Sequence, residues 1–126
     1  MCMPNNSYRS GSDFERFIRD VYESQGYSCV RSAGSHTPVD LIAWKIGEGW
    51  ISHVDLVQCK KERKKHSYDE DCIELAGVPA GKGWRKLLFV KRKGEIEVFR
   101  LVGGGKELEE TFTVKELKDA MINRKV

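Results

Sequence analysis

The chain has 126 residues, of which 40% are hydrophobic and 33% are charged. This length suits one domain, and this composition excludes a disordered or collagen-like chain because enough apolar residues are present to form a core. No apolar run approaches the roughly 20 residues that cross a bilayer, and the first residues lack the apolar segment of a secretion signal. We therefore expect one globular, intracellular domain with no membrane partner, in the cytoplasm of a cell or of a virus-infected host.

The first half of the chain predicts one helix followed by three strands. Residues 1–11 are polar, and we expect them to form a flexible arm before a single domain over residues 12–126. Apolar residues recur at helical spacing from Phe14 to Tyr22, and Gly26 suits a helix end, which predicts a helix beginning at Ser12. Three β-rich runs follow, separated by turn residues; they span residues 27–32, 39–44 and 51–60.

The second half predicts a short helix, a hairpin and a final helix. The short helix spans residues 67–76, and the hairpin joins strands 86–91 and 95–101 through Lys93-Gly94. Thr113 and Glu116 have the spacing of a capping box, which predicts the start of the last helix. The resulting order predicts an α/β fold in which a mixed five-stranded sheet is flanked by helices.

Polar residues occur where two of the predicted strands begin or end. Asp40 opens an otherwise apolar strand, and Gln58 and Lys60 alternate with Cys59 so that they share one face of the next long strand. A hairpin between these strands places a carboxylate, an amide oxygen and an ammonium together, with the backbone carbonyl of Cys59 within reach of a hard cation. Asp40 could equally cap a turn. An isolated QxK motif more often marks only the point where a strand leaves the core and becomes polar.

The basic residues are concentrated in two stretches although the net charge is only +3. Five basic residues and one acid lie between Lys60 and His66, and six basic residues with no acid lie between Lys82 and Lys93. A solvated loop and a phosphate-binding surface both fit such stretches. The first stretch follows Lys60 directly, which favours contact with DNA phosphates.

Three segments of the sequence occur together in one known family: RSAGSH (residues 31–36), PVDLIA (residues 38–43) and QCK (residues 58–60). With them, the stretch from Gly11 to about Leu75 resembles the archaeal-type Holliday junction resolvases of the PD-(D/E)xK nuclease superfamily. The resemblance implies a restriction-endonuclease-like fold and a metal-dependent, structure-selective endodeoxyribonuclease. It further implies a homodimer that cuts branched DNA at four-way junctions, with Mg²⁺ as cofactor and Mn²⁺ as a substitute.

The resemblance also implies roles for individual residues. Glu15, Asp40 and Gln58 take the catalytic metal-ligand positions, Cys59 adds its carbonyl, and Lys60 takes the position of the catalytic lysine. The residues expected to contact DNA are Arg16, Arg31, Ser32, Ser35, His36, Lys61, Arg63, Lys64 and Lys65. Without the resemblance, the local sequence predicts that Glu15 forms an exposed ion pair with Arg19, four residues further along the helix.

One position departs from the family pattern. The third acidic position is usually glutamate, whereas Gln58 offers a neutral ligand that holds Mg²⁺ less strongly. Two alternatives therefore stay open: a different PD-(D/E)xK endonuclease, acting in restriction, nicking or repair, and a junction-binding module that does not cleave. Cleavage assays on junction and linear DNA separate all three.

Overall fold

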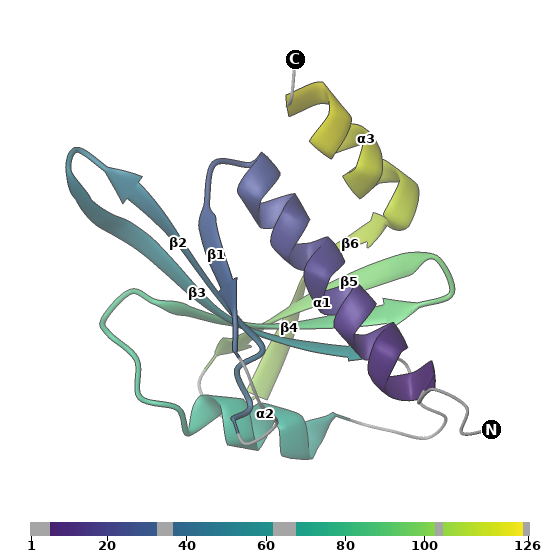
Figure 1. The fold of residues 1–126 in the computed structure, drawn as a ribbon. Helices are drawn as coiled ribbons and strands as arrows, with labels where there is room; N and C mark the ends of the chain where they lie inside the picture. The colour runs from purple at the N-terminus through teal and green to yellow at the C-terminus, as the bar shows by residue number, and fades with distance from the viewer. Residues whose placement is uncertain (1–5, 33–36, 62–67, 103–104, 125–126) are drawn as a thin grey trace.

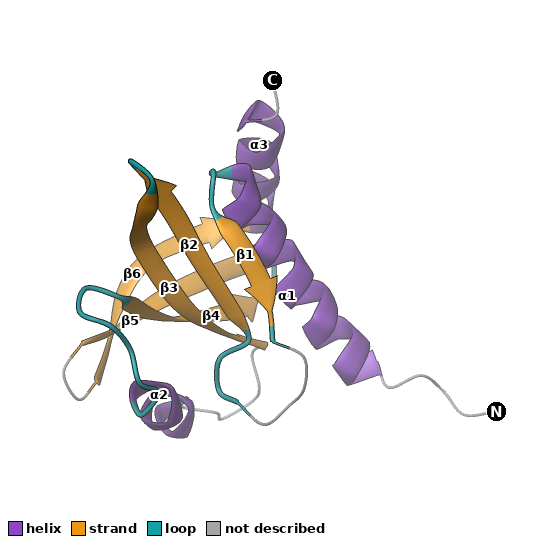
Figure 2. Cartoon of the chain, turned by 60° about the vertical axis from the view of Figure 1, so that its left-hand side comes forward, coloured by secondary structure: helices purple, strands orange, loops and turns teal. Residues whose placement is uncertain are grey.

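The computed structural model describes residues 6–32, 37–61, 68–102 and 105–124. A six-stranded sheet forms the centre, with α1 and α3 against one face and α2 against the other (Figures 1 and 2). The elements in chain order are α1 (Asn6–Ser24), β1 (Ser28–Arg31), β2 (Leu41–Gly47), β3 (Trp50–Lys61), α2 (Asp69–Ala76), β4 (Arg85–Arg92), β5 (Glu95–Val102), β6 (Gly105–Thr113) and α3 (Val114–Arg124). No helix among these residues is long and apolar enough to cross a membrane.

The strands lie in the sheet in the order in which they occur in the chain. Neighbouring strands are antiparallel except for β3 and β4, which are parallel with Lys60 opposite Val90 and Lys61 opposite Lys91. A parallel pair needs a crossover connection, and α2 lies within that connection. The carboxyl ends of β3 and β4 therefore lie at the same edge of the sheet.

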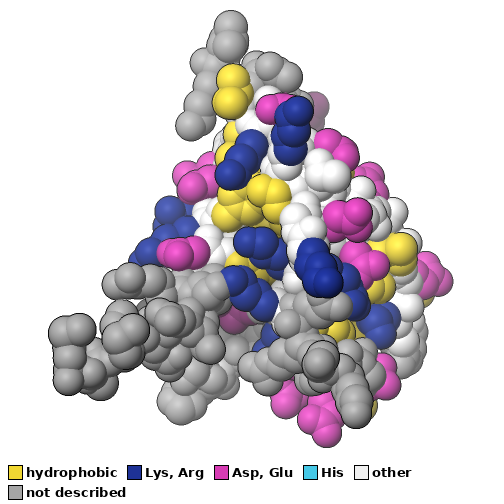
Figure 3. All heavy atoms as spheres, turned by 90° about the vertical axis from the view of Figure 1, so that its right-hand side faces the viewer, with side chains coloured by type: hydrophobic (Ala, Val, Ile, Leu, Met, Phe, Trp, Pro, Cys, Tyr) yellow, Lys and Arg dark blue, Asp and Glu magenta, His cyan; other side chains and the backbone are white. Residues whose placement is uncertain are grey.

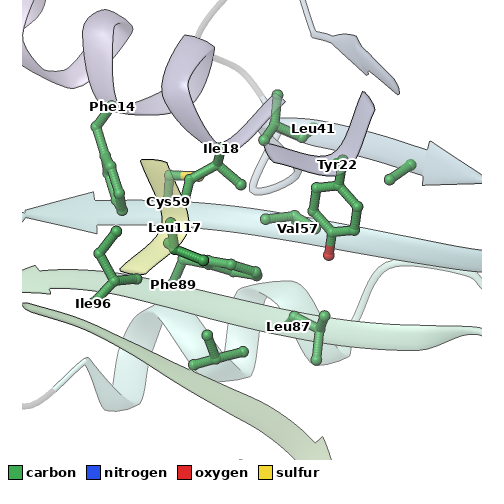
Figure 4. Close-up of a cluster of buried hydrophobic side chains, with 12 residues drawn as sticks. Phe14, Ile18, Tyr22, Leu41, Val57, Cys59, Leu87, Phe89, Ile96 and Leu117 are labelled. Atoms are coloured by element: carbon green, nitrogen blue, oxygen red, sulfur yellow. The ribbon is translucent and has the colours of Figure 1, made fainter. Parts of the chain in front are cut away.

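The main core lies between α1 and the sheet. Phe14, Ile18 and Tyr22 recur every four residues, so they share one face of α1 and are buried. Figure 4 shows them directed toward side chains of the central strands, with Leu117 of α3 closing the cluster. This packing fixes the position of α1, and with it the position of Glu15.

A buried polar network holds the same layers together. The Asp55 side chain of β3 is fully buried, and it accepts a bidentate pair of hydrogen bonds from Arg85, both 2.8 Å long. The Tyr22 hydroxyl donates to the same carboxylate at 2.9 Å, and Nε2 of His53 lies 2.9 Å from Oδ1. Burial and the charge of Asp55 raise the pKa of the Tyr22 hydroxyl well above 10. Asp55 thus joins α1, β3 and β4.

The mixed α/β architecture and its helix-flanked sheet are confirmed, but the predicted strand count of five is wrong. The missed strand is β6, which pairs with β5 at the edge of the sheet. Most of its residues are exposed on both faces, so it lacks the alternation of apolar and polar residues that indicates a strand. Charged residues such as Glu107 and Glu109 protect this free edge from pairing with another chain.

The boundary of the predicted arm also changes. The helix α1 begins at Asn6 rather than at Ser12, so residues 6–11 extend the helix, and residues 1–5 lie outside the described residues. These polar residues carry no apolar periodicity of their own, which is why the sequence pattern placed the helix start later. The capping box of α3 is confirmed, because the Thr113 hydroxyl accepts a hydrogen bond of 3.0 Å from the Glu116 amide.

Candidate active site

Asp40 lies directly before β2 and is held by three hydrogen bonds. Its amide donates to the Val57 carbonyl at 2.8 Å, and its carbonyl accepts from the Ser32 amide at 2.9 Å. Its side-chain Oδ2 accepts a bond of 2.8 Å from the Cys59 amide. The carboxylate is therefore fixed against the end of β3, at Cys59, which lies between Gln58 and Lys60 in the strand.

The surroundings of Asp40 raise the pKa of its carboxyl from 3.8 to about 6. Burial is the main cause, and the nearby charge of Glu15 adds to it. The Cys59 amide and the positive charges of Lys60 and Arg31 act in the opposite direction. Glu15, Lys60 and Arg31 therefore all lie close enough to Asp40 to act on its charge.

Glu15 is positioned by an ion pair with Arg31. The guanidinium of Arg31 donates to Oε1 of Glu15 from Nε at 3.3 Å and from Nη2 at 3.2 Å. Nη2 also donates to the Ser12 hydroxyl at 2.8 Å. The glutamate is partly buried against β1, so the alternative of an exposed pair with Arg19 does not describe it; Arg19 pairs with Asp20 and Glu23 instead.

Gln58 is buried at 4% exposure, and its amide oxygen Oε1 has no hydrogen-bond partner among the described residues. A buried amide oxygen without a partner is costly, because it has lost its hydrogen bonds to water. Such an oxygen is also a suitable ligand for a hard cation. Its position on β3, two residues before Lys60 on the same face, brings it to the strand end that Asp40 contacts.

Lys60 lies at the end of β3 with a side chain that is one-third exposed. Its Nζ lies 3.4 Å from Oδ1 of Asp71 in the first turn of α2. It also acts electrostatically on Asp40, as described above. The ammonium is thus placed between carboxylates from two different elements.

The remaining predicted contacts to DNA divide into three groups. Arg16 is exposed on α1 and pairs with Asp13 at 3.7 Å, whereas the Ser32 hydroxyl donates to the Val39 carbonyl at 2.8 Å and helps to close the loop before β2. Lys61 ends β3 at the edge described above. The others lie outside the described residues; they are Ser35, His36, Arg63, Lys64 and Lys65.

The fold brings two lysines of the second basic stretch, residues 82–93, to this edge. Lys91 pairs in register with Lys61, and Lys93 is exposed in the turn between β4 and β5. We call Lys61, Lys91 and Lys93 the basic edge. Figure 3, which faces the side of the molecule on which β3 and β4 end, shows lysine and arginine side chains gathered there around an apolar area. A parallel crossover from β3 to β4 was the signal that could have predicted that Lys61 and Lys91 lie at the same edge.

The donor set fits a divalent hard cation. Asp40 feels the charge of Glu15 and bonds to the Cys59 amide beside Gln58, whose buried oxygen has no partner among the described residues; oxygen ligands of this kind suit Mg²⁺ or Mn²⁺. The described residues contain no group of three His, Cys, Asp or Glu side chains that could hold a metal. Repulsion between Glu15 and Asp40 is a cost that a bound cation relieves.

The chain is similar to known nucleases. Residues 8–95 match a protein-family model, Mrr_cat, that is described as a restriction endonuclease. The chain is also 37% identical over 106 residues to the crossover junction endodeoxyribonuclease Hjc of Methanocaldococcus jannaschii. That alignment covers 80% of this chain and 75% of the archaeal protein. The family match, over residues 8–95, includes the segments that carry Glu15, Asp40, Gln58 and Lys60.

Proposed function

The chain belongs to the restriction endonuclease family, and from this premise we propose that it is a Mg²⁺-dependent endodeoxyribonuclease that resolves four-way DNA junctions. The observation that carries the proposal is the hydrogen bond that holds the Asp40 carboxylate against the end of β3, where the charges of Glu15 and Lys60 act on it. The similarity to a crossover junction endodeoxyribonuclease supports the junction as substrate.

Glu15, Asp40 and the amide oxygen of Gln58 would hold the metal ion, and the Cys59 carbonyl is a fourth candidate ligand. A bound Mg²⁺ supplies charge neutralisation for the scissile phosphate and activation of the attacking water. The Cys59 amide fixes the Asp40 carboxylate, and Arg31 fixes Glu15, so the two acids keep their positions without DNA. This preorganisation lowers the cost of assembling the site.

Lys60 acts through its positive charge. Its Nζ lies 3.4 Å from the Asp71 carboxylate, and its positive charge acts on Asp40. A fixed ammonium at this position can stabilise the extra negative charge that develops on the phosphate during hydrolysis. We therefore assign Lys60 an electrostatic role rather than that of a general base.

The basic edge supplies the approach for DNA. Lys61, Lys91 and Lys93 lie at the carboxyl ends of β3 and β4, and Lys61 directly follows Lys60. Contacts of lysine with phosphates read the backbone and the shape of DNA rather than its sequence. Such a surface suits an enzyme that selects a branched structure.

The function is tested by incubating the purified protein with Mg²⁺ and either a four-way junction or a linear duplex of matched sequence. We expect the junction to be cut, and we expect Asp40→Ala and Lys60→Ala to abolish cleavage while junction binding is retained. Equal cleavage of the linear duplex would instead assign another endonuclease activity. A junction that is bound but never cut, with no effect of Asp40→Ala, would assign a DNA-binding module.

We further propose a homodimer, because two active sites are needed to cut two strands of one junction. Exposed apolar side chains on the hairpin between β2 and β3, namely Ile46, Trp50 and Ile51, support a protein contact. Trp50 is 73% exposed, which is unusual for so large an apolar side chain. Sedimentation of the protein at micromolar concentration should give the mass of a dimer, and a monomer that still cuts both strands would contradict the proposal.

A further inference from the structure

The carboxylate of Asp71 lies next to the catalytic lysine position although it comes from a different layer of the fold. Its Oδ1 is 3.4 Å from Nζ of Lys60, and the Asp71 side chain is only 13% exposed. Glu15 belongs to α1 on one face of the sheet, whereas Asp71 belongs to α2 on the other (Figure 2). Charges that are shielded from water in this way interact more strongly than charges on the surface.

The helix α2 is fixed at both ends, which holds Asp71 in place. At its start, the buried Tyr68 donates a hydrogen bond of 3.2 Å from its hydroxyl to the Lys61 carbonyl at the end of β3. At its far end, the Lys86 ammonium donates to the carbonyls of Ala76 and Val78 at 2.7 and 2.6 Å. Lysine at this end of a helix satisfies carbonyl groups that have no helical partner.

The charges of the site show why a further carboxylate matters. Among the described groups that act on Asp40, Glu15 is negative, and Lys60 and Arg31 are positive. Together with Asp40 itself, these four groups carry no net charge. Gln58 contributes an oxygen but no charge. The number of charged ligands and neighbours is a main determinant of affinity for a divalent cation.

We propose that Asp71 supplies the negative charge that Gln58 does not provide, and that it positions Lys60 beside the metal site. This inference rests on the function proposed above. Two independent observations carry it. One is the ion pair between Asp71 and Lys60, and the other is the buried oxygen of Gln58, which has no partner in the described part of the chain and lies on the same face of β3 as Lys60. Asp71 is a positioning residue, since it acts on the reaction through Lys60 and through the field at the site.

The test measures binding of Mn²⁺ in the absence of DNA by electron paramagnetic resonance. We expect Asp71→Asn to weaken Mn²⁺ binding at least tenfold, the size of effect that residues outside the ligand shell commonly have. The matched control is Glu70→Gln, which removes one charge from the adjacent exposed position of α2 and should leave the affinity unchanged. Circular dichroism confirms that each variant is folded.

A compensating change makes the test specific to charge. Adding Gln58→Glu to Asp71→Asn moves the carboxylate from α2 to β3, so we expect Mn²⁺ affinity to return to within threefold of the wild-type value. Gln58→Glu alone should bind Mn²⁺ more tightly than the wild type, and this variant keeps the inference testable if Asp71→Asn fails to fold. Gln58→Glu should not restore Mn²⁺ binding to a variant in which Asp40 is replaced.

Cleavage kinetics provide the second readout. We expect Asp71→Asn to lower kcat on the junction with little change in KM, because it removes an effect on the reacting phosphate rather than a DNA contact. A variant that binds Mn²⁺ and cuts like the wild type would overturn this inference alone, and so would the absence of any effect of Gln58→Glu. A wild-type protein that neither binds Mn²⁺ nor cuts junctions would instead overturn the proposed function.

Discussion

The hydroxyl of Tyr22 donates a hydrogen bond of 2.9 Å to the buried carboxylate of Asp55, and so joins α1 to β3. Tyr22 lies about two helical turns from Glu15 on α1, and Asp55 lies three residues before Gln58 on β3. The same carboxylate accepts two hydrogen bonds from Arg85. This contact therefore fixes the relative position of α1 and β3, which carry two of the proposed metal ligands, Glu15 and Gln58.

We predict that Asp55→Asn lowers the free energy of unfolding by about 3–5 kcal/mol, because it leaves the Arg85 guanidinium without its charged partner. Tyr22→Phe should cost about 1 kcal/mol, since it removes one hydrogen bond and keeps the ion pair. Urea denaturation monitored by circular dichroism measures both values. An Asp55→Asn variant as stable as the wild type would show that the network does not hold these layers together.

Asp40 should destabilise the metal-free protein at neutral pH. Its pKa of about 6 in the folded state exceeds the ordinary value of 3.8, so the folded state binds its proton more tightly than the unfolded state does. The resulting stabilisation is complete below about pH 4 and is lost as the pH rises through 6. Asparagine carries no charge and still offers an oxygen to the Cys59 amide.

We therefore predict that, at pH 8, Asp40→Asn increases the free energy of unfolding of the metal-free protein by about 1–2 kcal/mol, after allowance for partial solvent exposure. The Tm should rise by a few degrees. At pH 4 the two proteins should unfold at nearly the same temperature. Differential scanning calorimetry in the presence of EDTA measures the difference. Asp119→Asn, an exposed change on α3, serves as the control, and an effect of Asp40→Asn that is equal at both pH values would refute the explanation.

The basic edge should determine the salt dependence of junction binding. Replacing Lys61, Lys91 and Lys93 together with glutamine removes three phosphate contacts, and each contact changes the slope of log K against log salt concentration by about 1. We expect the slope to become shallower by about 3 when binding is measured by fluorescence anisotropy without metal.

The control for this measurement is a triple variant of basic residues outside the basic edge. Lys45, Lys82 and Arg100 are exposed at other positions of the sheet and its loops, and their replacement by glutamine removes the same total charge. The salt slope of this variant should match that of the wild type. If both triple variants change the slope equally, the binding depends on net charge and not on the basic edge.

Sequence patterns indicated the candidate site residues whose placement depends on local structure. Asp40 was found because an acid after a proline opens an apolar strand, and Gln58 and Lys60 were placed on one face by the alternation of a strand. The contact between Asp40 and the Cys59 amide follows from the hairpin between β2 and β3. The family resemblance added Glu15, which local patterns alone would have placed on the surface.

Features that depend on packing between layers could not be predicted in this way. Asp71 lies beside Lys60 only because α2, in the connection between β3 and β4, packs on the sheet. The acidic residues around Asp71 resemble those of the first turn of any exposed helix. Lys91 joins Lys61 only through parallel pairing. The edge strand β6 was missed because its exposed, charged residues lack the pattern of a half-buried strand.

The most direct test of the account is the position of a bound cation. Crystals of the protein grown with Mn²⁺ should give an anomalous difference peak in contact with carboxylate oxygens of Asp40 and Glu15 and with Oε1 of Gln58. A peak bound elsewhere, or a structure in which these three groups point into separate regions of solvent, would contradict the assignment of the active site.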